Sequence, residues 1–213
     1  MVRLWQIATI LLLASCRTAT ASSKIYIYSD NPVSATDCIF KGQDSVTVKL
    51  FMDNGQYSQT GFSYLKKARD YGVAHVSGLF TWCHEYSCAS LENQVEATVN
   101  QLKIQNTFVD IFWVNMETGP LFVDKPKYQQ DLQKIVDKAT SMNQKVGIYS
   151  SKDRWDMFVG LDYEGMKTLP LWDYFPDTPN ITNPGYGGWN ERYITSYADD
   201  NLCGNTVGVE LLH

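Results

Sequence analysis

The amino-acid sequence predicts an α/β fold, in which a single domain of about eight strands forms an incomplete β/α barrel. Short runs of β-branched and aromatic residues recur along the chain, which is typical of strands. Segments with helical spacing separate the earlier runs, and strands that alternate with helices form parallel β–α–β units. After residue 150 the helical signal weakens and the connections become rich in Pro, Gly and Asn. The predicted architecture is therefore a TIM-like barrel with its helices concentrated in the first two thirds; an open doubly wound sheet is the alternative.

The expected elements follow one another in a regular order. Strands are expected at residues 24–28, 45–51, 73–80, 109–114, 145–150, 169–172, 193–197 and 207–211. Helices are expected at residues 61–71, 90–105 and 126–143, with a shorter one at 152–159. The third helix has one apolar face, which consists of Leu132, Ile135, Val136 and Ala139.

Residues 1–21 have the pattern of a secretory signal peptide. A basic start at Arg3 precedes an apolar run at residues 7–13 and the small residues Ala19-Thr20-Ala21. The run is shorter than the roughly 20 apolar residues that a membrane helix needs, and no later stretch of the sequence approaches that length. We therefore expect residues 22–213 to form one soluble domain that is secreted, or that lies in the lumen of the secretory and lysosomal pathway.

Charge and histidine spacing argue against several classes of function. The chain has 23 acidic and 18 basic residues, a net charge of −5, and no basic cluster. Nucleic acid and anionic membranes are therefore not expected as partners. His75, His84 and His213 lack metal-ligand spacing, and no serine lies in a nucleophile-elbow pattern. We expect a monomer that needs no metal and no cofactor.

Cysteine number predicts two disulfides. Removal of the signal peptide takes Cys16 away and leaves Cys38, Cys83, Cys88 and Cys203, an even count in an exported chain. A zinc site is the alternative, but the spacing of Cys83 and Cys88 lacks a second matching pair. We predict the pairs Cys38–Cys203 and Cys83–Cys88. The first pair joins the segment after the first strand to the segment before the last, which are neighbours only if the barrel closes.

One glycosylation sequon lies in the last third of the chain. Asn180-Ile181-Thr182 has the acceptor pattern for an N-linked glycan. The neighbouring residues Pro179 and Pro184 indicate an exposed loop, so we expect Asn180 to carry a glycan.

The candidate chemistry lies where the fourth expected strand ends. Asn115 and Glu117 follow an apolar run and are two residues apart, so they share one face of the strand. In a parallel barrel the carboxyl ends of the strands form the mouth of the active site. A carboxyl group there, flanked by Trp113 and Met116, would have a raised pKa and would suit a general acid. The alternative is an ordinary surface glutamate in a loop.

Several motifs together carry a resemblance to a known family. The chain resembles the glycoside hydrolase family 25 lysozymes, specifically the secreted branch found in nematodes and protists. The resemblance spans nearly all of residues 22–213 and implies a barrel that cleaves the β-1,4 bond between N-acetylmuramic acid and N-acetylglucosamine in peptidoglycan, in defence against bacteria or in digestion. The motifs are, in order, Asp30-Asn31-Pro32-Val33-Ser34, Val114-Asn115-Met116-Glu117, Val146-Gly147-Ile148-Tyr149-Ser150-Ser151, Pro170-Leu171-Trp172, Gly187-Gly188-Trp189 and Cys203-Gly204.

The resemblance also implies which residues would act. The family has an Asp-x-Glu pair whose Glu protonates the leaving oxygen, and Glu117 occupies that position. Asn115 replaces the paired Asp, while Tyr28 and Gly208 replace acids of the first and last strands, as counted from neighbouring motifs. Asn115 can hydrogen-bond an N-acetyl group but cannot take up a proton or neutralise a positive charge. We therefore expect hydrolysis to be weak or lost.

Two alternatives remain at this stage. Asp30 and Glu210 lie two residues beyond the replaced positions, and either could supply a carboxylate if its strand were shifted by about 6.6 Å. The chain could also be a descendant that binds glycan or protein without cutting it. Tyr149 and Trp172 close expected strands and are the candidate rings for stacking on sugars.

Overall fold

The computed structural model describes residues 27–28, 39–120, 124–174, 183–202 and 205–212. These residues form one eight-stranded sheet whose strands are neighbours in sequence order. Adjacent strands are parallel from β1 to β7, and β8 runs antiparallel to β7. The strands are β1 (Ile27–Tyr28), β2 (Ser45–Phe51), β3 (His75–Phe80), β4 (Phe112–Asn115), β5 (Val146–Ser150), β6 (Leu171–Tyr174), β7 (Ile194–Leu202) and β8 (Asn205–Leu212).

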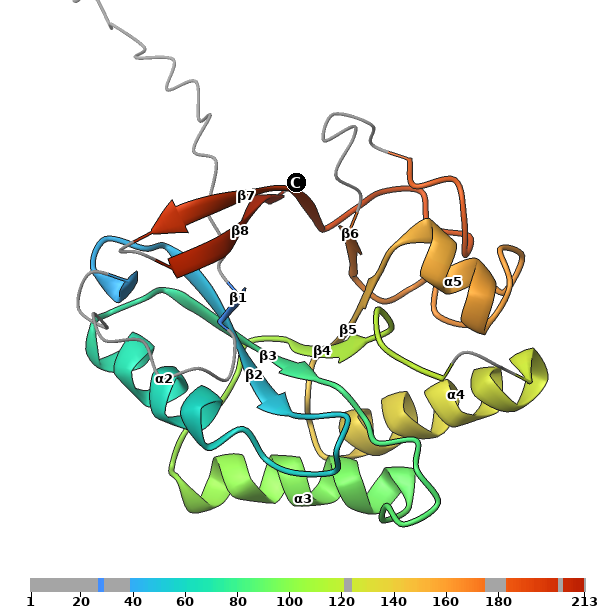
Figure 1. Cartoon of the computed structure of the whole chain (residues 1–213), viewed down its shortest axis with the longest axis horizontal. Helices are drawn as coiled ribbons and strands as arrows, with labels where there is room; N and C mark the ends of the chain where they lie inside the picture. The colour runs from blue at the N-terminus through green and yellow to red at the C-terminus, as the bar shows by residue number, and fades with distance from the viewer. Residues whose placement is uncertain (1–26, 29–38, 121–123, 175–182, 203–204, 213) are drawn as a thin grey trace, which may run out of the picture.

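The sheet curls until its last strand returns beside its first. Figure 1 shows β8 next to β1, and Cα atoms of the two strands lie within 8 Å of each other. A doubly wound sheet reverses its strand order partway along, and this sheet does not, so that alternative is excluded. The expected incomplete TIM-like barrel is confirmed.

Helices cover the outside of the parallel part of the barrel. They are α2 (Gln59–Asp70), α3 (Leu91–Ile104), α4 (Lys125–Ser141) and α5 (Lys152–Phe158). Helix α2 packs against β2 and β3, α4 packs against β4 and β5, and α3 lies against α4 (Figure 1). The last of these helices ends at Phe158, so the helices of the described residues lie in the earlier part of the chain, as expected.

Local sequence signals explain where these helices begin. Each starts after a residue whose side-chain oxygen accepts a hydrogen bond from a backbone N–H of the first turn, which satisfies a donor that the helix leaves free. The capping residues are Ser58, Ser90, Asp124 and Ser151. The predicted apolar face of α4 is confirmed, because Leu132, Ile135, Val136 and Ala139 are all buried.

The core has two layers, one on each face of the sheet. The larger layer fills the space between strands and helices and includes Val48 and Val114. The smaller layer fills the inside of the barrel and consists of Leu79, Ile111, Trp113, Tyr149, Trp172 and Ile194. Gly147 leaves room for this inner layer, because a Cβ atom there would collide with the ring of Trp113. The barrel interior is therefore a packed core rather than a channel.

Strand boundaries differ from expectation mainly in the last third. Strand β6 begins at Leu171 instead of residue 169, because Pro170 has no N–H to donate and the Leu169 carbonyl accepts the indole N–H of Trp189 at 2.9 Å. Strands β7 and β8 are longer than expected. Only the first residues of β7 pair with β6, and the rest of β7 continues as a hairpin with β8.

Several predictions concern residues outside the described part of the chain. These are the signal peptide at residues 1–21, the Cys38–Cys203 pair and the glycosylated Asn180, and all of them remain predictions. The predicted Cys83–Cys88 disulfide is present, and it closes the loop after β3. Among the described residues, no helix has the length and apolar character needed to cross a membrane.

Candidate functional site

Asn115 and Glu117 lie where β4 ends, and a hydrogen bond joins the two residues. Asn115 is the last residue of β4 and is only 6 % exposed. Its Nδ2 donates to Oγ1 of Thr81 at 2.8 Å, and its Oδ1 accepts the backbone N–H of Glu117 at 2.8 Å. Both polar atoms of the amide are therefore used within the protein, and they hold the segment that carries Glu117.

The carboxyl group of Glu117 lies against the start of α5. One oxygen accepts the backbone N–H of Ser151, the residue that caps this helix. Burial raises the pKa of Glu117, and the hydrogen bonds from Ser151 and the charge of Arg154 oppose that rise. The net direction is upward, so the protonated form persists to higher pH than in an exposed glutamate. A partly buried, protonated carboxyl group is what a general acid requires.

Asp173 is a second buried carboxylate near Glu117, and sequence reasoning missed it. It lies on β6, is 1 % exposed, forms an ion pair with Arg192 and accepts the hydroxyl of Tyr186 at 2.9 Å. Burial raises the pKa of Asp173, while Arg192 and Tyr186 oppose the rise. Its negative charge also raises the pKa of Glu117. The sequence does carry one signal for Asp173: it is a charged residue that directly follows Leu171-Trp172 in an apolar strand.

The two candidate stacking residues lie at different depths. Trp172 is fully buried, and its Nε1 donates to Oγ of Ser196 at 2.8 Å inside the barrel. Tyr149 packs above it, with ring centroids 4.4 Å apart, and is 8 % exposed. Tyr174 lies 6.1 Å from the Tyr149 ring and is 41 % exposed. Trp172 therefore supports Tyr149 from below, and Tyr174 is the ring that reaches solvent at the rim.

Backbone pairing shows where Tyr28 and Gly208 lie, the two residues that replace acids of the first and last strands. Tyr28 pairs with Val48, which packs between sheet and helices, so Tyr28 has a register position on the face opposite to that of Asn115. Gly208 pairs with Asp199 in the hairpin beyond the rim. Glu210 pairs with Ser196, whose hydroxyl lies inside the barrel. Register thus brings Glu210 level with the mouth; Asp30 lies outside the described residues.

A cavity lies at the same end of the barrel as Glu117, although Glu117 does not line it. Its volume is about 420 Å³, and it is lined by the loops that follow β2, β3 and β4, namely Asp53, Asn54, His84, Glu85, Gly119 and Pro120. The Cys83–Cys88 disulfide constrains the loop that carries His84. Burial of the imidazole, which stacks on Tyr128, lowers the pKa of His84 to about 4. His84 is therefore a neutral hydrogen-bonding group at neutral pH, a role that its spacing in the sequence did not indicate.

The mouth thus offers hydrogen-bonding groups and one acidic group. Among the described residues, no group of three His, Cys, Asp or Glu side chains could hold a metal ion. Glu117 can donate a proton, while the amide of Asn115 cannot accept one. The arrangement suits binding of a polar, uncharged molecule and protonation of one of its oxygens.

Comparison with known proteins matches this geometry to one family. Residues 17–183 match the family model described as Lysozyme-like protein 1. Lysozyme-like protein 5 of Caenorhabditis elegans is 29 % identical over 211 residues, which cover 96 % of this chain and 97 % of that protein. The family GH25 lysozyme of Aspergillus fumigatus has a similar fold, with a TM-score of 0.63 and 15 % identity over 90 % of this chain and 94 % of that one.

A second solved structure with a similar fold belongs to a longer chain. The modular autolysin LytC of Streptococcus pneumoniae, in complex with a synthetic peptidoglycan ligand, matches with a TM-score of 0.69 and 16 % identity. The match covers 90 % of this chain but only 46 % of the autolysin chain. The common part is therefore the barrel, and the likeness to both solved structures concerns the fold.

Proposed function

Because the chain belongs to the lysozyme-like protein 1 family and is a lysozyme-like protein of the family 25 type, we propose that it is a secreted protein directed at peptidoglycan, with weak hydrolysis. In this proposal Glu117 protonates the oxygen of the glycosidic bond. The protein acts in defence against bacteria or in digestion. The signal-peptide pattern, the predicted disulfides and the sequon support secretion.

One observation carries the proposal: an acid and an amide stand where the family has two acids. Glu117 is partly buried with a raised pKa, so it supplies the proton. Glycosidases pair such an acid with a carboxylate that stabilises the positive charge developing on the sugar. Asn115 occupies that place, and its amide has no negative charge to offer. Proton donation to the leaving oxygen is thus supported, whereas stabilisation of the positive charge that develops in the same step is weakened.

Peptidoglycan is the substrate that the comparisons favour. The autolysin with a similar barrel is known in complex with a synthetic peptidoglycan ligand. The mouth of this chain carries a cavity with neutral and acidic hydrogen-bonding groups, which suits the hydroxyl and N-acetyl groups of such a glycan.

A second candidate function is binding without hydrolysis. Asn115 favours it, because the amide keeps the shape and hydrogen bonds of the site while removing a charge. The same mouth would then hold glycan, or a protein partner, in an intact form.

Two assays on purified bacterial cell wall separate these functions. We expect wild-type protein to sediment with insoluble peptidoglycan and to clear a wall suspension slowly. Glu117→Gln should abolish the clearing and leave sedimentation unchanged, because Gln preserves the acceptor for the Ser151 N–H but supplies no acidic proton. The matched control is Glu92→Gln in the first turn of α3. Sedimentation without any clearing by the wild type would favour the binding function, and failure to sediment would contradict both hydrolysis of peptidoglycan and binding to it.

A further inference from the structure

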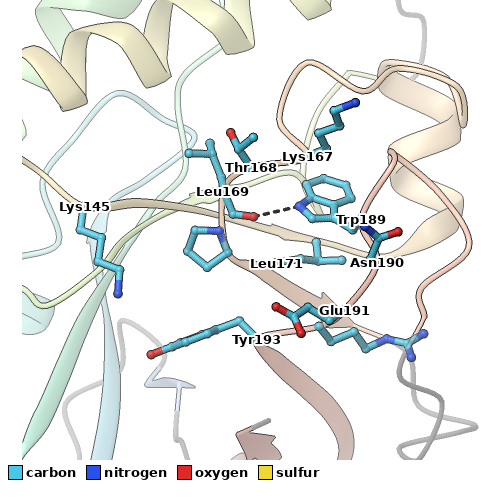
Figure 2. Close-up of a pocket in the computed structure, with 11 residues that line it drawn as sticks. Lys145, Lys167, Thr168, Leu169, Leu171, Trp189, Asn190, Glu191 and Tyr193 are labelled. Carbon is cyan, nitrogen blue, oxygen red and sulfur yellow. Dashed lines mark hydrogen bonds between the residues drawn. The ribbon is translucent and has the colours of Figure 1, made fainter.

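A groove lies at the end of the barrel opposite to Glu117. Its volume is about 610 Å³, and its walls are the segments that lead into β5, β6 and β7 (Figure 2). The lining residues are Lys145, residues 167–171 and residues 189–193. Because these segments precede parallel strands whereas Glu117 follows one, the groove lies at the other end of the barrel from the mouth, although its lining residue Arg192 reaches the buried Asp173.

Two further hollows continue this groove. One of about 240 Å³ at the base of the barrel is also lined by Lys145 and Tyr193, together with the hydroxyl residues Ser45 and Ser77. Another of about 680 Å³ is also lined by Lys167, Thr168, Trp189 and Asn190. Adjoining hollows of this kind suit an elongated ligand rather than a compact one.

The charges in the groove are few and nearly balanced. Lys167 is paired with Glu164 at 2.8 Å, and Arg192 is paired with the buried Asp173. Glu191 is exposed and makes no ion pair with a described residue. The ammonium of Lys145 lies 5.5 Å from the centroid of the Tyr193 ring. One available carboxylate and one available ammonium favour an uncharged ligand over a polyanion or a polycation.

The floor of the groove is fixed in place. The indole N–H of Trp189 donates to the Leu169 carbonyl, drawn as a dashed line in Figure 2. The backbone N–H of Tyr193 donates to the Leu171 carbonyl at 2.8 Å. The half-buried ring of Tyr193 and the half-buried Pro170 present apolar surface beside the polar groups. Rigid apolar surface next to a few polar groups is the usual character of a small-ligand site.

Figure 2 shows how the polar groups are spread. Lys145 and Tyr193 lie at one end, Trp189 and Asn190 lie at the other, and Glu191 lies between them. A carboxylate accepts from sugar hydroxyls, an ammonium donates to hydroxyl and ring oxygens, and an amide pairs with an N-acetyl group. The apolar face of a pyranose ring packs on an aromatic surface.

We propose that this groove is a second saccharide site, which binds an uncharged β-1,4-linked N-acetylglucosamine chain and anchors the protein to insoluble glycan. The proposal deepens the proposed function, since it gives a protein directed at peptidoglycan a second contact with polymeric glycan. Two sites at opposite ends of the barrel bind a polymer network more tightly than either does alone, because the second contact becomes intramolecular.

Titration with chitotetraose, the tetramer of N-acetylglucosamine, tests the groove directly. The dissociation constant is measured by calorimetry, and the affected amides are located by NMR. We expect shifts at residues 167–171 and 189–193. Lys145→Ala and Glu191→Ala should each weaken binding about tenfold, because each removes a charged hydrogen-bonding partner. Both side chains are exposed, so the variants should fold normally, which circular dichroism verifies.

Matched controls separate the groove from the mouth. Lys66→Ala on α2 and Glu92→Ala on α3 remove the same charges elsewhere, and Glu117→Gln alters the mouth; all three should keep the wild-type affinity of the groove. The groove proposal is overturned if Lys145→Ala and Glu191→Ala bind chitotetraose as the wild type does, or if the wild type does not bind it. Sedimentation with peptidoglycan by a protein that does not bind chitotetraose would overturn the groove proposal and leave the proposed function standing. Chitotetraose binding at the groove without sedimentation or clearing would contradict the proposed function, and it would also show that the groove does not anchor the protein to insoluble glycan.

Discussion

The hydrogen bonds of Asn115 determine what a restored acid would do. Its Nδ2 donates to the hydroxyl of Thr81, and a hydroxyl can rotate to donate instead of accept. Its Oδ1 accepts the Glu117 N–H, which a carboxylate oxygen does equally well. Asp at position 115 would therefore keep both contacts. Its charge would also raise the pKa of the neighbouring Glu117 further, which favours the proton donor.

We accordingly predict that Asn115→Asp raises wall hydrolysis. We expect the rate of wall hydrolysis to rise about tenfold to a hundredfold, which is at or below the low end of the range for one acid–base group. The gain is limited because one substitution restores only part of a set of residues that act together. The initial rate of clearing of a wall suspension measures it. Asn115→Asp combined with Glu117→Gln should return to background, and an unchanged rate in the single variant would refute the role of position 115.

The raised pKa of Glu117 has a consequence for stability. A carboxyl group with a higher pKa in the folded than in the unfolded chain binds more protons when folded. Its contribution to stability is complete below the unfolded value near 4.5 and is lost as pH rises through the folded value. Glu117→Gln should therefore melt at a higher temperature than the wild type at pH 7, and the difference should vanish near pH 4. Thermal unfolding across this range measures it; a constant difference would indicate an ordinary surface glutamate.

At the residue scale, sequence reasoning found the pair at the mouth but not its surroundings. Asn115 and Glu117 could be predicted to share a face because strand side chains alternate with a period of two. The partners of Asp173 could not, because Tyr186 and Arg192 come from a loop with no periodic pattern. The same holds for His84, whose low pKa arises from burial against Tyr128, which belongs to a distant helix.

At the scale of elements, the Asp173–Arg192 pair ties β6 to the segment that enters β7. Both side chains are buried, at 1 % and 5 % exposure. Removal of one member leaves a buried charge without its partner, which costs about 3 to 5 kcal/mol in such sites. Asp173→Asn should lower the free energy of unfolding in urea by about that amount. Asp173→Leu combined with Arg192→Met should recover much of the loss, and equal losses in both variants would show that packing rather than charge dominates.

Helices and parallel strands were predictable, whereas the direction of the last strand was not. Residues 126–143 show helical spacing over several turns, so α4 was placed within two residues at each end. The last two strands gave only short apolar runs, which look alike in parallel and antiparallel pairs. The hairpin of β7 and β8 follows instead from pairing between the two strands beyond the rim of the sheet.

On the scale of the whole molecule, the position of β8 beside β1 supports the predicted Cys38–Cys203 disulfide, whose cysteines lie outside the described residues. Cys38 follows β1 and Cys203 precedes β8, and these two strands lie side by side in the barrel. A disulfide between them would close 166 residues of chain, against six for Cys83–Cys88. In the chain-entropy account the longer loop contributes about 5 kcal/mol and the shorter about 2 kcal/mol.

We therefore predict that Cys38→Ser combined with Cys203→Ser lowers the free energy of unfolding by more than Cys83→Ser combined with Cys88→Ser does. The paired substitutions avoid leaving a free thiol, and urea unfolding of oxidised protein gives the two losses on one scale. Peptide mapping of the oxidised wild type identifies the bonds directly. A link between Cys38 and Cys83 would contradict the pairing, and equal losses in the two double variants would show that the first and last strands are held together by packing alone.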